Sequence, residues 1–174
     1  VTYQGGTIKD VFGATLEPIE GLIVDIGLPI HYRIPGRVYA DDFFHMEGMV
    51  LLKNEKDPGS DYHLGYTDLG DYADYYITVP EAGNYYIQAR AANNFGSDGR
   101  VQFEQLDFEE NVLHSVEVKL PPTGGWENWN TSPASSWQLE PGRSILRMRV
   151  VKSGINLTWF LMIRNSQILN SEEG

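Results

Sequence analysis

The sequence predicts an all-β protein, more specifically a β-sandwich jelly roll of two antiparallel sheets. Several stretches alternate apolar and polar residues with the period of two that a half-buried strand requires. Gly- and Pro-rich segments separate these stretches, and no long stretch shows the period of a helix. Many short strands joined by turns of this kind are typical of sandwiches and jelly rolls.

The strand pattern begins near Ile34 and is clearest from Tyr72 onward. In the stretch 72–79, Ala73, Tyr75, Ile77 and Val79 share one face, which we expect to be buried. Clusters rich in Pro and Gly at 80–84, 121–122 and 141–142 are predicted turns. The predicted strands from this point are residues 72–79, 85–92, 101–106, 112–120, 144–151 and 155–163.

The chain divides into three parts on the same pattern. Residues 1–33 lack paired alternating stretches, which indicates a leader or linker with one short strand; the alternative is an extra strand packed on the main domain. Residues 34–164 form the predicted domain, and 165–174 a C-terminal tail. Because the sequence starts abruptly at Val1 without a recognisable signal peptide, we expect a piece cut from a larger protein.

Composition excludes several function classes. At 174 residues the chain is long enough for one domain with a real core. Its net charge of −11 provides no positive field for phosphates, so nucleic acid and anionic lipid are not expected partners. There is no cysteine for a disulfide framework or thiolate chemistry, and no apolar run of membrane-spanning length.

The titratable residues do not form a convincing catalytic or metal site. The four histidines are scattered, so we interpret them as structural or surface residues. Asp68, Asp71 and Asp74 could supply paired carboxylates, but Asp71 follows Gly70 in a predicted tight turn, where Asp bonds local amides. The segment 56–61 resembles a calcium loop only loosely, and a solvated loop is the preferred interpretation.

Three segments combine an aromatic ring or an amide with glycine or a strand end. They are residues 65–72, 123–126 and 154–160, and they place Tyr66, Trp126 and Asn156 at predicted loop tips. Flat rings and a carboxamide suit a sugar, which offers apolar faces and hydroxyl groups. Trp126 is predicted to be an exposed platform, with burial as the alternative, whereas Trp159 alternates with Leu157 and Leu161 and is predicted to be core.

Taken together, these segments resemble the family 6 carbohydrate-binding modules. Members of that family share Ile-Pro-Gly, Gly-Tyr followed by Gly-Asp-aromatic, a Pro-x-x-Gly-x-Tyr turn, Thr-Gly-Gly-Trp, and a final Asn with Trp/Tyr-Phe. The resemblance covers about residues 34–164 and leaves 1–33 unexplained. The matching residues are Ile34-Pro35-Gly36, Gly65-Tyr66, Gly70-Asp71-Tyr72 with Tyr75, Pro80 to Tyr85, Thr123 to Trp126, and Asn156 with Trp159-Phe160.

The resemblance implies a non-catalytic β-sandwich with a ligand cleft in the loops at one end. Tyr66 and Trp126 would sandwich a sugar ring and Asn156 would bond its hydroxyls. Some members use a second cleft on the concave face, where Tyr72 would contribute. Family acids that hold structural calcium are replaced by Tyr39, Asp41 and Thr158. No cofactor is therefore required; we expect no calcium ion, or a weak site built from backbone carbonyls and Asp41.

The sequence thus predicts a non-catalytic module that targets a polysaccharide-degrading enzyme to a neutral plant or algal glycan: β-glucan, xylan or agar-type galactan. The catalytic domain of the parent enzyme would be its other partner. We expect a monomer, without membrane insertion, from a bacterial protein that is extracellular or at the cell surface, with the periplasm as a variant. The alternatives are a small jelly-roll glycoside hydrolase or lyase, and a spacer without ligand, which requires a buried Trp126.

Overall fold

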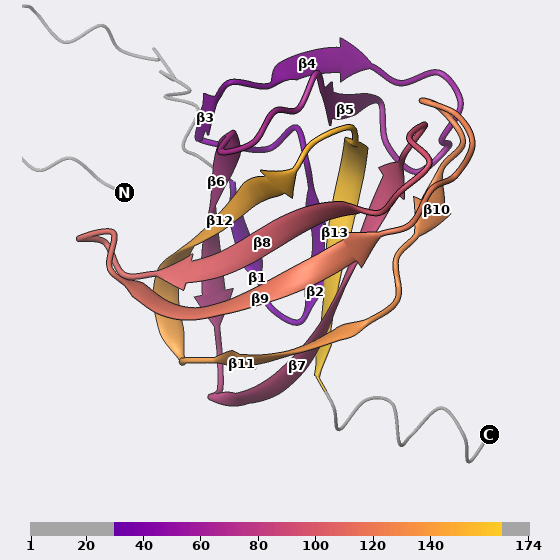
Figure 1. Ribbon diagram of the computed structural model, residues 1–174. Helices are drawn as coiled ribbons and strands as arrows, with labels where there is room; N and C mark the ends of the chain where they lie inside the picture. Colours follow the sequence, from indigo (N-terminus) through magenta and orange to yellow (C-terminus); the bar gives the residue numbers. More distant parts are fainter. Residues whose placement is uncertain (1–29, 165–174) are drawn as a thin grey trace, which may run out of the picture.

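The computed structural model describes residues 30–164, and these form two β-sheets packed face to face (Figure 1). One sheet has the order β1-β6-β12-β8-β9, with β3 also paired to β6. Its strands are β1 (His31–Arg33), β3 (His45–Glu47), β6 (Tyr72–Val79), β8 (Gly99–Leu106), β9 (Val112–Leu120) and β12 (Gly142–Lys152).

The second sheet has the order β10-β7-β13-β5-β4, with β11 paired to β7 and β2 paired to β13. Its strands are β2 (Gly36–Tyr39), β4 (Val50–Lys53), β5 (Tyr62–Gly65), β7 (Gly83–Ala92), β10 (Asn130–Thr131), β11 (Ser135–Leu139) and β13 (Asn156–Arg164). In Figure 1, β8 and β9 cross in front of β13 and β2, so the two layers are seen one behind the other. The predicted all-β sandwich is confirmed, with one exception to its antiparallel pairing, because β1 runs parallel to β6.

The alternating patterns are the reason that the two sheets have a common core. Every residue of the predicted buried face of β6 is essentially inaccessible, from Ala73 to Val79, and the equivalent face of β7 behaves in the same way. Aromatic side chains fill the centre, where Phe160 lies edge-on to Tyr75 at 5.1 Å between ring centroids. The Tyr75 hydroxyl donates to the carbonyl of Ala40 at 2.8 Å, so this buried polar group is paired.

Trp159 is buried, but not where the sequence pattern placed it. A register irregularity in β13 between Leu157 and Trp159 shifts the alternation, so Leu157, Phe160 and Met162 enter the core. The Trp159 ring lies instead beneath the guanidinium of Arg37, whose central carbon is 4.2 Å from the ring centroid. The prediction that Trp159 belongs to the core was therefore right about burial and wrong about the layer.

The predicted leader and tail fall largely outside the described residues. Of the leader, residues 1–29 are not described, and neither is the tail 165–174. The last residues of the predicted leader, His31–Arg33, do form a strand on the domain. Residues 30–164 contain no helix long and apolar enough to cross a membrane.

Candidate functional site

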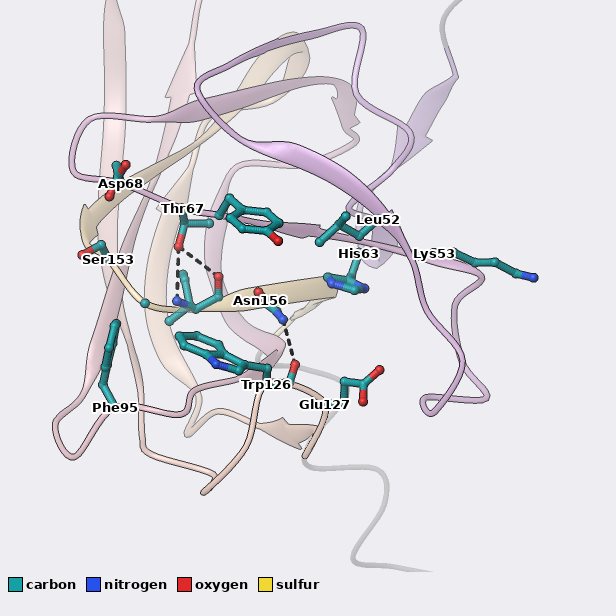
Figure 2. Close-up of a pocket in the computed structure, with 13 residues that line it drawn as sticks. Leu52, Lys53, His63, Thr67, Asp68, Phe95, Trp126, Glu127, Ser153 and Asn156 are labelled. Carbon is teal, nitrogen blue, oxygen red and sulfur yellow. Dashed lines mark hydrogen bonds between the residues drawn. The ribbon is translucent and has the colours of Figure 1, made fainter.

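Five segments that are far apart in the sequence meet at one end of the sandwich and form a cleft of about 680 Å³. The segments are the β4–β5 hairpin, the loop after β5, the loops after β7 and β9, and the turn from β12 into β13. Because β13 pairs with both β7 and β5, these loops emerge side by side. The lining residues are Leu52, Lys53, His63, Tyr66, Thr67, Asp68, Phe95, Trp126, Glu127, Ser153, Gly154, Ile155 and Asn156 (Figure 2).

Tyr66 stands at the first position after β5 with an unusual backbone conformation. Its φ is 53°, in the left-handed region that a bulky L-residue rarely adopts. The side chain is 74% exposed, so burial of the ring does not explain the conformation. Strained residues that packing does not require are concentrated at functional sites, which marks this tyrosine as a ligand-binding candidate.

Trp126 is held in the opposite loop by contacts that leave its ring accessible. Gly124, with a φ of 77°, lets the chain turn just before it, and Thr123 Oγ1 donates to the carbonyl of Gly125 at 3.1 Å. The indole is 41% exposed. This exposure contradicts the spacer alternative, which required Trp126 to be buried.

Asn156 lies at the floor of the cleft, at the first residue of β13, and only 8% of it is exposed. Its Nδ2 donates to the Trp126 carbonyl at 2.7 Å, a bond drawn in Figure 2. This bond leaves Oδ1 and the second N–H for an outside group. Gly65 permits the arrangement, because a Cβ there would lie 2.9 Å from Asn156 Oδ1.

A threonine ties the Tyr66 loop to the turn before β13. Thr67 Oγ1 donates to the carbonyl of Ile155 at 2.9 Å and accepts from its N–H at 3.2 Å. Thr67 is itself buried, so this pair of bonds is shielded from water. The two bonds fix the distance between the Tyr66 loop and the cleft floor.

The structure thus brings Tyr66, Trp126 and Asn156 into one cleft, and their role in binding stays a prediction. Two other lining residues, Phe95 and His63, were not predicted from the sequence. Phe95 is 51% exposed, and its ring meets that of Trp126 edge-on, with 5.3 Å between centroids. Phe95 is followed by Gly96 in a loop between strands, so the criterion that singled out Trp126, a ring beside glycine in such a loop, would also have found Phe95.

His63 carries no such signal, because it sits within a strand and resembles a structural histidine. It is 5% exposed on β5, and the Trp129 ring lies edge-on to it at 5.3 Å. Burial lowers the pKa of His63, and the carboxylate of Glu127 opposes this effect. The Nδ1 atom is buried without a hydrogen-bond partner in the part of the chain that the structure describes.

Tyr72 lies away from this cleft, at the start of β6 on the other sheet. The guanidinium carbons of Arg147 and Arg149 are 4.2 and 5.2 Å from its ring centroid, and its hydroxyl is 3.2 Å from His45 Nε2. The ring is therefore partly covered by cations rather than open as a platform. A second cleft at Tyr72 stays a prediction.

Asp71 has the structural role that the turn interpretation predicts, and Asp74 has a different one. One carboxylate oxygen of Asp71 accepts the backbone N–H of Asp68 at 2.7 Å. Asp74 is buried and forms a bidentate ion pair with Arg147, with both N–O distances at 2.8 Å. Since two of the three carboxylates are engaged in this way, they are not arranged as an acid–base pair across the cleft.

The segment 56–61 is not simply a solvated loop, because Asp57 is only 6% exposed. Its two carboxylate oxygens accept from Arg90 Nε and from the second Arg90 nitrogen, each at 3.3 Å. Thr158 Oγ1 also donates to Asp57, at 3.2 Å. The interpretation as a solvated loop was therefore wrong for Asp57, whose charge is neutralised inside the protein.

These contacts decide how the residues fit a calcium ion. The hydroxyl of Thr158 already donates to Asp57, whose carboxylate is paired with the guanidinium of Arg90. Asp41 lines a separate hollow with Tyr39 and Asp61, and burial raises its pKa, helped by the nearby carboxylates. Within residues 30–164 no group of three or more Asp, Glu or His could hold a metal ion. The residues do not fit a calcium site built from carboxylates.

Comparison with known proteins agrees with this geometry. The pattern described as "Carbohydrate binding module (family 6)" matches residues 39–164. The beta-agarase AgaO of Microbulbifer thermotolerans is 32% identical over 88 residues, which are 49% of this chain and 7% of the agarase. The chain therefore spans a small part of this relative.

Two solved structures share the fold. The module CBM6cm-2 from Cellvibrio mixtus lichenase 5A, solved with cellotriose, has a TM-score of 0.67 and 26% identity over 75% of this chain and 98% of that module. A β-1,3-glucan-binding module from Bacillus halodurans has a TM-score of 0.67 and 22% identity over 78% of this chain and 100% of that one. Sequence pattern and fold lead to one conclusion: the chain belongs to the family 6 carbohydrate-binding modules.

Proposed function

We propose that the end-loop cleft binds a neutral glycan through Tyr66, Trp126 and Asn156. One observation carries the proposal: two accessible aromatic rings and a nearly buried carboxamide line the same cleft. The rings would cover the apolar C–H faces of a pyranose, and the carboxamide would bond its hydroxyls. An epimer with a misplaced hydroxyl would leave the Asn156 amide unpaired and would bind less well.

The charges around the cleft support a neutral ligand. Lys53, Asp68 and Glu127 line it, so neither sign dominates. Glu127 is already paired with Lys56 at 2.6 Å. A ligand recognised by apolar faces and neutral hydrogen bonds gains little from ion pairing, so its affinity should not depend on salt.

The candidate ligands are β-glucan, xylan and agar-type galactan. The relatives' names support the first and the last: one module was solved with cellotriose, another binds β-1,3-glucan, and one of the matching relatives is an agarase. Because the cleft is open to water and would hold only a few sugar units, we expect a Kd on the order of 10 µM to 1 mM, about −7 to −4 kcal/mol.

We further propose that the module is a monomeric part of a secreted or cell-surface bacterial enzyme that degrades polysaccharides. By holding the catalytic domain near its substrate, it would raise the local substrate concentration without taking part in the chemistry. The module itself is non-catalytic as a member of its family. When the isolated chain is incubated with a panel of glycans, no new reducing ends should therefore form on them.

The test is isothermal titration of the domain with these glycans. Trp126→Ala and Tyr66→Ala should each abolish detectable binding while the thermal midpoint stays close to that of the parent. Tyr62→Ala is the matched control, because Tyr62 is 42% exposed on β5 and does not line the cleft. If both cleft variants bind as the parent does, the site is elsewhere, and Tyr72 becomes the next candidate.

A further inference from the structure

Phe95 is built into the cleft with more support than an exposed loop residue needs. Asn93, 1% exposed, accepts the Phe95 N–H on Oδ1 at 2.9 Å. Its Nδ2 donates to the carbonyls of Ser97 and Leu120, each at 3.0 Å. A fully bonded, buried carboxamide therefore fixes the loop that carries Phe95.

The hydrogen bonds of Asn93, which we call the Asn93 clamp, also hold the loop that carries Trp126. Thr123 Oγ1 accepts the N–H of Asn93 at 2.9 Å, and the Thr123 N–H donates to the Asn93 carbonyl at 2.8 Å. Thr123 is three residues before Trp126, so the two aromatic loops are bonded at their bases. Phe95 and Trp126 are thereby kept at a set distance and angle.

Gly154 packs against one edge of the Phe95 ring. A Cβ at Gly154 would lie 1.8 and 1.9 Å from two ring carbons of Phe95, so any side chain there would displace the ring. One edge of the ring thus rests on backbone, while 51% of the residue stays exposed. A phenyl group that is held along one edge and half exposed can offer a face as a stacking platform.

The angle between the two rings limits which ligand can use both. The planes of Phe95 and Trp126 meet at 84°, with their centroids 5.3 Å apart. A sugar ring on Trp126 and the next sugar ring on Phe95 would then lie nearly perpendicular to each other. In a β-1,4-glucan, successive rings lie almost in one plane, as in a flat ribbon. In a β-1,3-glucan, the linkage turns each ring relative to the last.

We propose that Phe95 forms a second stacking position that makes the cleft select glycans with a turning backbone, represented by β-1,3-glucan, over flat β-1,4-linked chains. The inference rests on the proposed function of the cleft and adds its substrate class. Ser153 and Asp68 lie at the same end of the cleft as Phe95 in Figure 2 and offer polar atoms to the hydroxyls of the second sugar. Phe95 is thus a specificity residue, separate from Trp126, which serves every ligand.

The test titrates the parent domain and Phe95→Ala with glucose and with the β-1,3-linked and β-1,4-linked glucotrioses. The parent should bind the β-1,3 trimer about tenfold more tightly, which corresponds to about 1.4 kcal/mol. Phe95→Ala should remove that preference, with a larger loss of affinity for the β-1,3 trimer than for the β-1,4 trimer. Phe108→Ala is the matched control, since Phe108 is 54% exposed and lies outside the cleft.

A second variant keeps the inference testable if Phe95→Ala loses stability. Phe95→Leu retains apolar contact with Trp126 but removes the flat face, and it should also lose the preference. Equal or tighter binding of the β-1,4 trimer by the parent would overturn the inference, and so would a Phe95→Ala effect of the same size on both trimers. Failure of the proposed function differs, because then Trp126→Ala would leave the binding of every sugar unchanged.

Discussion

The left-handed backbone of Tyr66 gives the sharpest test of how the cleft is built. Two substitutions, Tyr66→Gly and Tyr66→Ala, remove the same ring and differ only in whether a Cβ is present at a φ of 53°. In an ordinary strand, a protein with Gly is less stable than the same protein with Ala by about 0.5–1 kcal/mol, because Gly gives the unfolded chain more conformational freedom. At Tyr66 the order should reverse.

The size of the reversal follows from two opposing costs. A Cβ in the left-handed region costs about 1–2 kcal/mol through its contact with the following carbonyl. At the midpoints of these two ranges, subtracting the entropic cost of Gly leaves the Gly variant more stable than the Ala variant by about 0.75 kcal/mol. For a domain of this size that difference raises the thermal midpoint by roughly 1.5–3 °C.

The assay is thermal unfolding combined with titration with the glycan that the parent domain binds. Both variants should lose binding, because neither has a ring to stack on the sugar. The matched pair Tyr62→Gly and Tyr62→Ala, in β5 without positive φ, should show the usual order, with Ala more stable. If Tyr66→Gly is no more stable than Tyr66→Ala, or if both still bind, the link between strain and ligand contact is refuted.

Four further outcomes are expected. Gly65→Ala should weaken glycan binding about tenfold, ~1.4 kcal/mol, with a smaller effect on the thermal midpoint, because the new Cβ would lie 2.9 Å from Asn156 Oδ1; unchanged titrations would contradict this. Arg90→Gln should lower the free energy of unfolding by about 1–3 kcal/mol, because it leaves buried Asp57 without its cation; Arg100→Gln, which removes an exposed pair with Glu117, is the control and should change it little. EDTA should not change the thermal midpoint of the parent, and an EDTA-induced drop would reveal a calcium site. Because burial lowers the pKa of His63 below its usual 6.5, the unfolded chain binds a proton first, so stability should fall as pH falls from 7 to 5; His63→Gln should flatten that fall, and an identical slope would exclude His63 as its source.

The sequence was most informative where the alternation of residues had one interpretation. The predicted strands 72–79 and 112–120 coincide with β6 and β9, because each has a clear pattern bounded by turn residues. The short strands β2 to β5 were not predicted individually, since three or four residues carry too little periodicity. The position of Trp159 was missed for a different reason: one irregularity in β13 reverses every side chain after it.

For the site, residue type found candidates but not their surroundings. Tyr66, Trp126 and Asn156 were singled out by glycine neighbours and by the family resemblance, and the fold places them together. The Asp57–Arg90 pair joins residues 33 positions apart, and the Asn93 clamp joins β7 to the end of β9, so neither has a local signature. Such contacts arise only when the sheets are assembled.

The clamp around Phe95 has a consequence for engineering this domain. Asn93 is buried and bonded, and Gly99 sits against Ile155 so closely that a Cβ would lie 2.2 Å from its Cγ2. The residues between them, 94–98, are almost all exposed. Asn93 and Gly99 therefore fix the two ends of this segment, and the residues between them can be exchanged as a unit. Exchanging residues 94–98 should retune which glycan is preferred while the Trp126 platform, and with it basic sugar affinity, stays in place.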